Sequence, residues 1–237
     1  MNSICFFKEE IIDQSKIIFN DEKRLGHIHN HLKSKVSDEV TITILDQGIY
    51  RATILELSHH NCTIEFKEAV QSSEPWFHLL VGLSRPQTIK KVLEHSSTLG
   101  AASFELFKAQ LSEKSYSQSK IYENLNFRQY LIDGLSQSKL YYNLPSFSLT
   151  NYMSLEKYLT HENKYFLSLN GIKTFNQLEA SKRSNPLLAV GPERGWTKQE
   201  ESKLIESGFK PIRISASTLR VEHAIYTAIG QLEMLNL

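Results

Sequence analysis

Short runs in the first seventy residues alternate between apolar and polar positions, as half-buried β-strands do. Val40–Leu45 is rich in β-branched residues, and a turn at Asp46–Gly48 follows it. Residues 49–57 and 62–66 continue as short strands, and residues 27–33 are expected to form a helical turn. This pattern predicts a compact β-barrel or a small sandwich.

The pattern changes near Ser72–Pro75, and strand-like and helix-like segments alternate after it. Strands are predicted at 76–83, 103–107, 165–169, 186–190 and 209–214, and helices at 87–99, 120–140 and 155–160. A last helix is expected to begin near Ser217 or Thr218, with its apolar face formed by Val221, Ala224, Ile225, Ala228, Ile229, Leu232 and Leu235. Such alternation is typical of an α/β domain with a mainly parallel sheet. We therefore expect two domains, residues 1–72 and residues 73–237.

The composition is that of a globular protein without a membrane segment. The chain has 237 residues, of which 41% are hydrophobic and 22% charged. No apolar run reaches the roughly 18 residues that can span a bilayer, and the N-terminus MNSICFFKEE carries acids where a signal peptide has basic residues. The two cysteines, Cys5 and Cys62, have no paired spacing and are expected to be reduced and inert. These features favour a cytoplasmic protein.

The charge is distributed unevenly along the chain. Residues 1–75 hold 8 Lys and Arg against 12 Asp and Glu, a balance of −4, whereas the remainder has a balance of +5. The N-terminal part as a whole would repel phosphate. Any contact with a nucleic acid must therefore come from local basic patches.

One candidate ligand site is the segment Leu187–Trp196, LLAVGPERGW. A buried strand leads directly into Gly191 and Pro192, and Thr197 with Glu200 forms a capping box that starts a helix. Glycine lets backbone amides approach a ligand closely, and open α/β sheets bind ligands beyond the carboxyl ends of their strands. A tight strand-to-helix turn without a ligand is the alternative.

A second candidate is the segment 211–224, PIRISASTLRVEHA, in which a strand again ends in small residues. Arg220 and Glu222 are expected in the first turn of the helix that follows. A glutamate suits the positive end of the helix dipole, but an arginine does not. Arg220 therefore indicates a partner elsewhere, either a substrate oxygen or the carboxylate of Glu193 or Glu222.

Together the two segments resemble the RsmE family of small-subunit rRNA methyltransferases, in the SPOUT superfamily. That family has a G-P-E-G-G loop and a later L-G-x-R-x-L-R-x-E-T-A segment, which appear here as G-P-E-R-G at 191–195 and I-S-A-S-T-L-R-V-E-H-A at 214–224. Weaker similarity extends upstream to Phe6-Phe7, to residues 27–40 and to residues 84–100. The likeness covers nearly the whole chain, with specific motifs only in the last fifty residues.

The resemblance implies an α/β fold with a C-terminal SPOUT trefoil-knot domain and a small N-terminal PUA-like β-barrel. It also implies a homodimer that binds S-adenosyl-L-methionine (SAM) and acts on 16S rRNA or the 30S subunit. The cofactor-binding residues it indicates are Leu169, Val190, Gly191, Pro192, Glu193, Gly195, Ile214, Ser215, Ala216 and Leu219. The implied reaction is methylation of N3 of one uridine, uracil 1498. Arg220 is expected to stabilise the charge that develops on the base, and Glu222 to orient Arg220 or to take the proton.

This chain also departs from the family pattern. Arg194 and Ser215 stand where the family has glycine, and Ser217 and Leu140 where it has arginine. We expect the RNA contacts to come from Lys33, Arg85, Gln137, Lys139 and Arg194. The departures leave the substrate open.

Three other functions stay open: a SPOUT enzyme for another RNA position, an RNA-binding protein without catalysis, and a small-molecule enzyme. His27, His29 and His31 alternate, but no acid or cysteine completes a ligand set, so no metal site is expected. No Rossmann or Walker motif is present.

Overall fold

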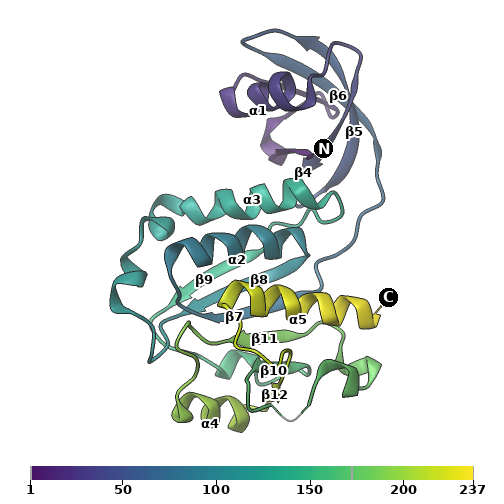
Figure 1. Cartoon of the computed structure of the whole chain (residues 1–237). Helices are drawn as coiled ribbons and strands as arrows, with labels where there is room; N and C mark the ends of the chain where they lie inside the picture. Colours follow the sequence, from purple (N-terminus) through teal and green to yellow (C-terminus); the bar gives the residue numbers. More distant parts are fainter. Residues whose placement is uncertain (1, 172, 237) are drawn as a thin grey trace. The chain divides into compact units, whose positions relative to one another are not determined.

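The computed structural model describes residues 2–171 and 173–236, which form two compact units (Figure 1). The first unit comprises Met1–Pro75 and Ile132–Leu144, and the second comprises Trp76–Leu131 and Pro145–Leu237. The sequence pattern indicates a boundary near residue 73. It does not indicate that a later segment, residues 132–144, belongs with the N-terminal unit.

The first unit is built on a curled six-stranded sheet in the order β1-β4-β5-β6-β3-β2 (Figure 1). Its strands are β1 (Ile4–Phe6), β2 (Ile11–Ile12), β3 (Lys16–Phe19), β4 (Glu39–Ile44), β5 (Gly48–Leu57) and β6 (Cys62–Ala69). Val40, Ile42 and Ile44 are buried in the core, as the alternation predicts. The β5–β6 register shifts twice, and such irregularities bend strands and increase their twist.

Two further segments complete the first unit. The helical segments α1 (Glu22–Gly26) and η2 (His27–Leu32) contribute Leu25 and Ile28 to its core. The segment 132–144 is joined through hydrogen bonds from Ser3 N to Ser136 O and from Leu144 N to the Asp46 carboxylate, each 2.8 Å long. Both cysteines are unpaired and buried, and burial raises the pKa of the Cys5 thiol to about 12 and that of Cys62 to about 11.

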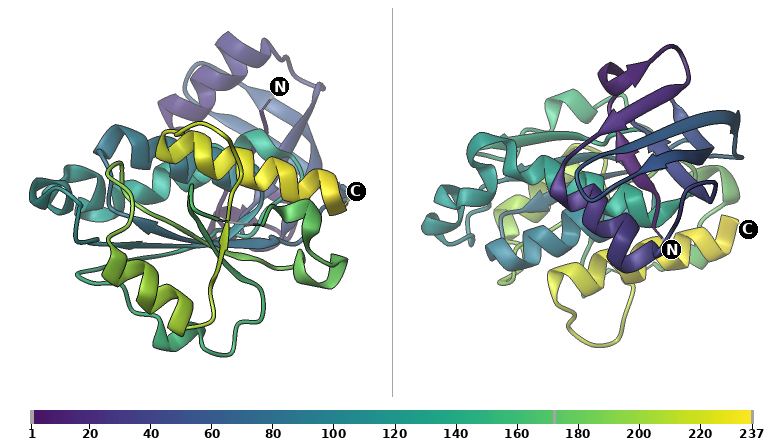
Figure 2. Two further views of the ribbon diagram at one scale, coloured as in Figure 1. Left: turned by 60° about the horizontal axis from the view of Figure 1, so that its bottom comes forward. Right: turned by 90° about the horizontal axis from the view of Figure 1, so that it is seen from above.

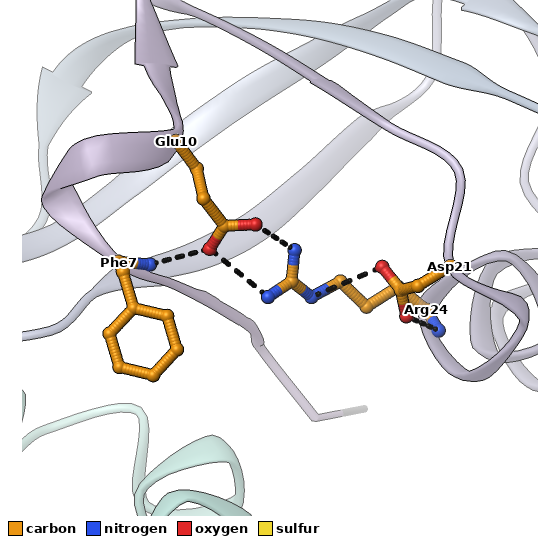
Figure 3. A network of polar contacts seen from close by, with 4 residues as sticks. All are labelled: Phe7, Glu10, Asp21 and Arg24. Carbon is orange, nitrogen blue, oxygen red and sulfur yellow. Dashed lines mark hydrogen bonds and ion pairs between the residues drawn. The ribbon is translucent and has the colours of Figure 1, made fainter.

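A network around Arg24 fastens the N-terminal strands to α1 (Figure 3). The Arg24 guanidinium donates to both carboxylate oxygens of Glu10, at 2.6 and 3.1 Å, and lies 3.6 Å from the Asp21 carboxylate. Glu10 also accepts a 2.8 Å hydrogen bond from Phe7 N. The guanidinium carbon lies 4.4 Å from the centre of the Phe6 ring. Arg24 therefore makes a bidentate ion pair and a cation–π contact at once.

The second unit contains a six-stranded sheet in which every neighbouring pair is parallel, in the order β12-β10-β11-β7-β8-β9. The strands are β7 (Phe77–Gly82), β8 (Ala101–Phe107), β9 (Ser146–Thr150), β10 (Lys164–Leu167), β11 (Leu187–Val190) and β12 (Lys210–Ile212). The parallel sheet predicted from the alternation is confirmed. β10 lies between β11 and β12, which both follow it in the sequence.

Helices cover both faces of this sheet (Figures 1 and 2). α2 (Pro86–Thr98) and α5 (Val221–Asn236) contact each other on one face, and α4 (Lys198–Glu206) covers the other. Leu204 of α4 packs in a core with Phe107 and Phe166. α3 (Asn126–Ser138) contributes residues to both units. No helix in the described ranges is long and apolar enough to cross a membrane.

The last helix begins later than the sequence indicates. α5 starts at Val221, not near Ser217 or Thr218, so Arg220 lies just before the helix and only Glu222 is in its first turn. Ser217 N donates to Ser215 Oγ at 3.1 Å. Such side-chain bonds to the backbone compete with helix formation, and they hold this segment as an irregular loop.

The Arg24 network gives a stability prediction. Because Arg24 is largely buried and bidentate, we expect Arg24→Ala to lower the free energy of unfolding by about 1–3 kcal/mol. Arg24→Lys should also lose stability, since an ammonium cannot pair bidentately. Equilibrium unfolding in urea measures both. As a control, Arg51→Ala removes an exposed pair with a 4.0 Å separation and should change stability by less than about 0.5 kcal/mol. Equal losses from the two alanine variants would contradict this assignment.

Candidate active site

The loops that leave three neighbouring strands enclose a cavity of about 530 Å³. They follow the carboxyl ends of β10, β11 and β12, the position at which open α/β sheets bind ligands. The cavity is lined by Leu167–Asn170, Val190–Trp196, Glu201, Ile214, Ser215, Ser217–Val221 and Ala224. Its size is within the range of roughly 300–1,000 Å³ typical of small-molecule sites.

Close backbone contacts fix the loop that follows β11. A Cβ atom on Gly82, at the end of β7, would lie 2.7 Å from Pro192 Cδ and 2.8 Å from Pro192 N. Gly195 has a φ of +73° and donates a 2.8 Å hydrogen bond to Pro192 O, so a left-handed residue closes the turn. The Glu193 carboxylate accepts a hydrogen bond from Arg85 N at 2.8 Å. The end of β7 and the segment that follows it therefore hold this loop in place.

Trp196 joins this loop to β10 and to the core. Its Nε1 donates to Leu167 O at 3.0 Å, and its ring stacks on Phe107 at a centroid distance of 6.1 Å and an interplanar angle of 10°. The capping box predicted from Thr197 and Glu200 is confirmed. Glu200 additionally accepts a 2.9 Å hydrogen bond from Gln110 N. The start of α4 therefore has a fixed place beside the cavity.

The loop that follows β12 is also anchored at close range. A Cβ on Gly171 would lie 2.7 Å from Arg213 N and from the Ile212 carbonyl carbon, so the loops after β10 and β12 touch through their backbones. Gln231 of α5 donates to Ile214 O at 2.9 Å. These contacts place residues 214–220 opposite the Gly191–Gly195 turn, across the cavity.

Most of the cofactor-binding residues predicted from the sequence line this cavity. They are Leu169, Val190, Gly191, Pro192, Glu193, Gly195, Ile214, Ser215 and Leu219, and Ala216 is not among the lining residues. The lining also includes Ser168, Trp196, Glu201 and Thr218, which the sequence analysis missed. Ser168 falls inside the strand predicted at 165–169, whereas β10 ends at Leu167 and leaves Ser168 at the start of the loop that lines the cavity.

The predicted catalytic pair is separated. Arg220 lines the cavity, is exposed, and its guanidinium makes no hydrogen bond or ion pair with the described residues. Glu222 is buried and does not line the cavity, and its carboxylate lies 4.0 Å from Lys91 Nζ on α2. The ion pair of Arg220 with Glu193 or Glu222, considered above, is not formed. Arg220 lies just before α5 and faces the cavity, whereas Glu222 lies in the first turn of α5 and faces Lys91 of α2.

The predicted RNA-binding residues lie in both units. Arg194 is exposed and lines the cavity, and Arg85 is exposed beside the Glu193 carboxylate. A hydrogen bond with Tyr116 raises the pKa of Arg85. In the first unit, Lys33, Gln137 and Lys139 are all exposed. The cavity therefore brings Arg194 and Arg220 together, and the first unit presents its own polar side chains to solvent.

The chemistry of the cavity is mixed. It offers apolar surface, two exposed arginines, and the carboxylates of Glu193 and Glu201. Within the described part of the chain, no three His, Cys, Asp or Glu side chains are grouped so that they could hold a metal ion.

The close approach of Gly82 to Pro192 gives a second prediction. Gly82→Ala must push the Gly191–Gly195 loop away, so we expect a loss of about 1–3 kcal/mol in stability and weaker ligand binding in the cavity. Gly230 in α5 has no atom within 4 Å of its ideal Cβ position, so Gly230→Ala should stabilise the protein by about 0.5–1 kcal/mol. Thermal unfolding of both variants checks this. A neutral Gly82→Ala would mean that the loop is not held at this point.

Known proteins similar in sequence to this chain are RNA methyltransferases. A family model described as RNA methyltransferase domain matches residues 71–233. Ribosomal RNA small subunit methyltransferase E 1 from Borreliella burgdorferi is 30% identical over 213 residues, 88% of each chain. Ribosomal RNA small subunit methyltransferase E from Treponema pallidum is 28% identical over 240 residues, 96% of this chain and 89% of that protein.

Solved structures share the fold. The ribosomal RNA small subunit methyltransferase E of Neisseria gonorrhoeae, bound to S-adenosyl methionine, has a TM-score of 0.76 at 18% identity over 98% of both chains. A Legionella pneumophila protein in complex with SAM has a TM-score of 0.74 at 18% identity, over 99% of this chain and 98% of that one. The resemblance that the two loop motifs indicated is confirmed. This chain belongs to the RNA methyltransferase domain family that includes the ribosomal RNA small subunit methyltransferases E.

Proposed function

We propose that this protein is a SAM-dependent methyltransferase that methylates N3 of one uridine, uracil 1498, in 16S rRNA. The observation that carries the proposal is the cavity at the carboxyl ends of β10, β11 and β12. In its wall lies Arg220, whose guanidinium pairs with none of the residues that the structure describes. Family membership indicates the reaction class, and the cavity is the candidate place on this chain for that reaction.

The cavity has properties that fit SAM. Its volume suits a ligand of that size, and Leu169, Val190 and Leu219 offer apolar surface for an adenine ring. Gly191 brings backbone into the wall, and its Cβ position is closed by the Trp196 ring at 3.2 Å. A bound SAM would supply an electrophilic methyl group on a sulfonium. The Gly191–Gly195 loop and residues 214–219 would hold and orient that cofactor.

Arg220 has the position and the charge for the acceptor step. N3 of uracil carries a proton, and its removal leaves negative charge on the base. A guanidinium beside a carbonyl oxygen of the base would stabilise that charge, and no carboxylate among the described residues pairs with Arg220 and would compete. Holding the base and the methyl donor in line would supply much of the remaining acceleration.

Of the two roles expected for Glu222, its position fits the positioning of Arg220 and not the removal of a proton. Because its carboxylate is buried toward α2, it stabilises the start of α5 and therefore the position of Arg220, and it does not reach the cavity. We therefore do not assign proton removal to Glu222.

The finer fold and partner assignments are also part of this proposal. The placement of β10 between β11 and β12 supports a SPOUT trefoil knot, and the curled sheet of the first unit supports a PUA-like domain. Lys33, Gln137 and Lys139 are exposed and are proposed to contact the RNA. We further propose that the protein acts as a homodimer on 16S rRNA or the 30S subunit in the cytoplasm.

Replacing Arg220 tests the mechanism. We expect Arg220→Ala to lower kcat by about 10²–10³-fold, since removal of one preorganised donor typically has that effect, while SAM binding and the fold persist. Methyl transfer from labelled SAM to 16S rRNA or 30S subunits measures it. The control, Lys198→Ala, alters an exposed cation of α4 outside the cavity and should leave kcat unchanged. An Arg220→Ala variant as active as the unmodified protein would remove Arg220 from the mechanism.

Arg194 should affect binding and not chemistry. If its exposed guanidinium contacts a phosphate, Arg194→Ala should raise KM for RNA. The slope of a plot of log affinity against log salt concentration should also become shallower by about one. Its kcat should stay close to that of the unmodified protein. RNA affinity at several salt concentrations, measured together with kcat, checks this. An unchanged slope would exclude the phosphate contact.

A further inference from the structure

Glu201 is a half-buried carboxylate in the cavity wall, and it has no cationic partner among the residues described by the structure. It lies in the first turn of α4, where Glu200 already fills the capping box, so capping does not account for it. One of its oxygens accepts a 3.2 Å hydrogen bond from Ser168 Oγ. In the described part of the chain, its second oxygen accepts no hydrogen bond, and no Lys, Arg or His nitrogen lies within 4.0 Å of the carboxylate.

The surroundings fix the direction of this carboxylate. Ser168 also lines the cavity, and its Oγ accepts a 3.2 Å hydrogen bond from Asn170 N, which ties it into its own loop. The other acid of the lining, Glu193, is exposed and is occupied by Arg85 N at 2.8 Å. A ligand that fills the cavity would remove this half-buried carboxylate from water, and a carboxylate removed from water needs hydrogen-bond donors or a cation. Glu201 therefore offers an open acceptor to whatever enters the cavity.

We infer that Glu201 is a cofactor-selecting residue whose free oxygen receives hydrogen-bond donors of the bound cofactor. This inference rests on the proposed function, which places SAM in this cavity. SAM carries three such donor groups: the amino group of its adenine, the hydroxyl pair of its ribose and the α-ammonium of its methionine part. Carboxylates commonly recognise ribose hydroxyls in the same way at the strand ends of other α/β sheets.

Binding measurements on the full chain test this. Glu201→Gln keeps the size of the side chain but removes its charge, and hydrogen bonds to charged groups are the stronger ones. We expect it to raise the Kd for SAM and for S-adenosylhomocysteine by about ten- to hundredfold in calorimetry. Methylthioadenosine keeps the ribose and lacks the ammonium. Equal weakening for all three ligands assigns the donors of the adenosine part, and weakening confined to the first two assigns the ammonium.

Two control variants separate recognition from a structural role. Ser168→Ala removes the internal hydrogen bond and leaves the carboxylate, so it should raise the Kd by less than roughly threefold. Glu206→Gln alters an exposed acid of the same helix and should bind as the unmodified protein does. A SAM affinity of Glu201→Gln within roughly twofold of the unmodified protein, or an equal loss in Ser168→Ala, would overturn the inference. If the unmodified protein itself fails to bind SAM, the proposed function falls instead.

Discussion

The position of β10 between β11 and β12 is the constraint on which the site depends. Parallel pairing aligns the carboxyl ends of these strands, so the loops that follow them must meet at one edge of the sheet. Close backbone contacts then leave little freedom, because Gly171 touches the end of β12 and Gly82 touches Pro192. The cavity therefore depends on the strand order and on two glycines, Gly171 and Gly82, at which one backbone segment approaches another closely.

The charged side chains around the cavity fall into two groups, those bonded to the surrounding helices and strands and those exposed on the irregular loops. Residues that continue strands or begin helices are tied to the scaffold, as Glu200 is through Thr197 and Gln110. Residues within the irregular loops, such as Arg194 and Arg220, stay exposed and lack internal partners in the described chain. Unpaired guanidinium groups suit contact with an anionic substrate. The same loops that enclose the cofactor cavity would thus also present the cations that meet the RNA.

The local patterns predicted much of the second unit but not how its parts come together. The strand ending at Val190, the capping box at Thr197 and the helix over 87–99 depend on neighbouring residues, and each is found in the structure. The start of α5 was misplaced, because the serine hydrogen bonds that delay it depend on side-chain geometry. Glu201 and Ser168 were missed as a pair, since they are thirty-three residues apart and meet only through the strand order.

The mechanism proposed for this protein requires SAM to bind among the three loops at the carboxyl ends of β10, β11 and β12. A crystal structure of the protein soaked or grown with SAM tests it most directly. We expect the adenosine and methionine parts between residues 168–170, the Gly191–Gly195 turn and residues 214–220, with the methyl group open toward Arg220. Density for SAM at any other place on the chain, or loops that close this cavity with their own side chains, would contradict it.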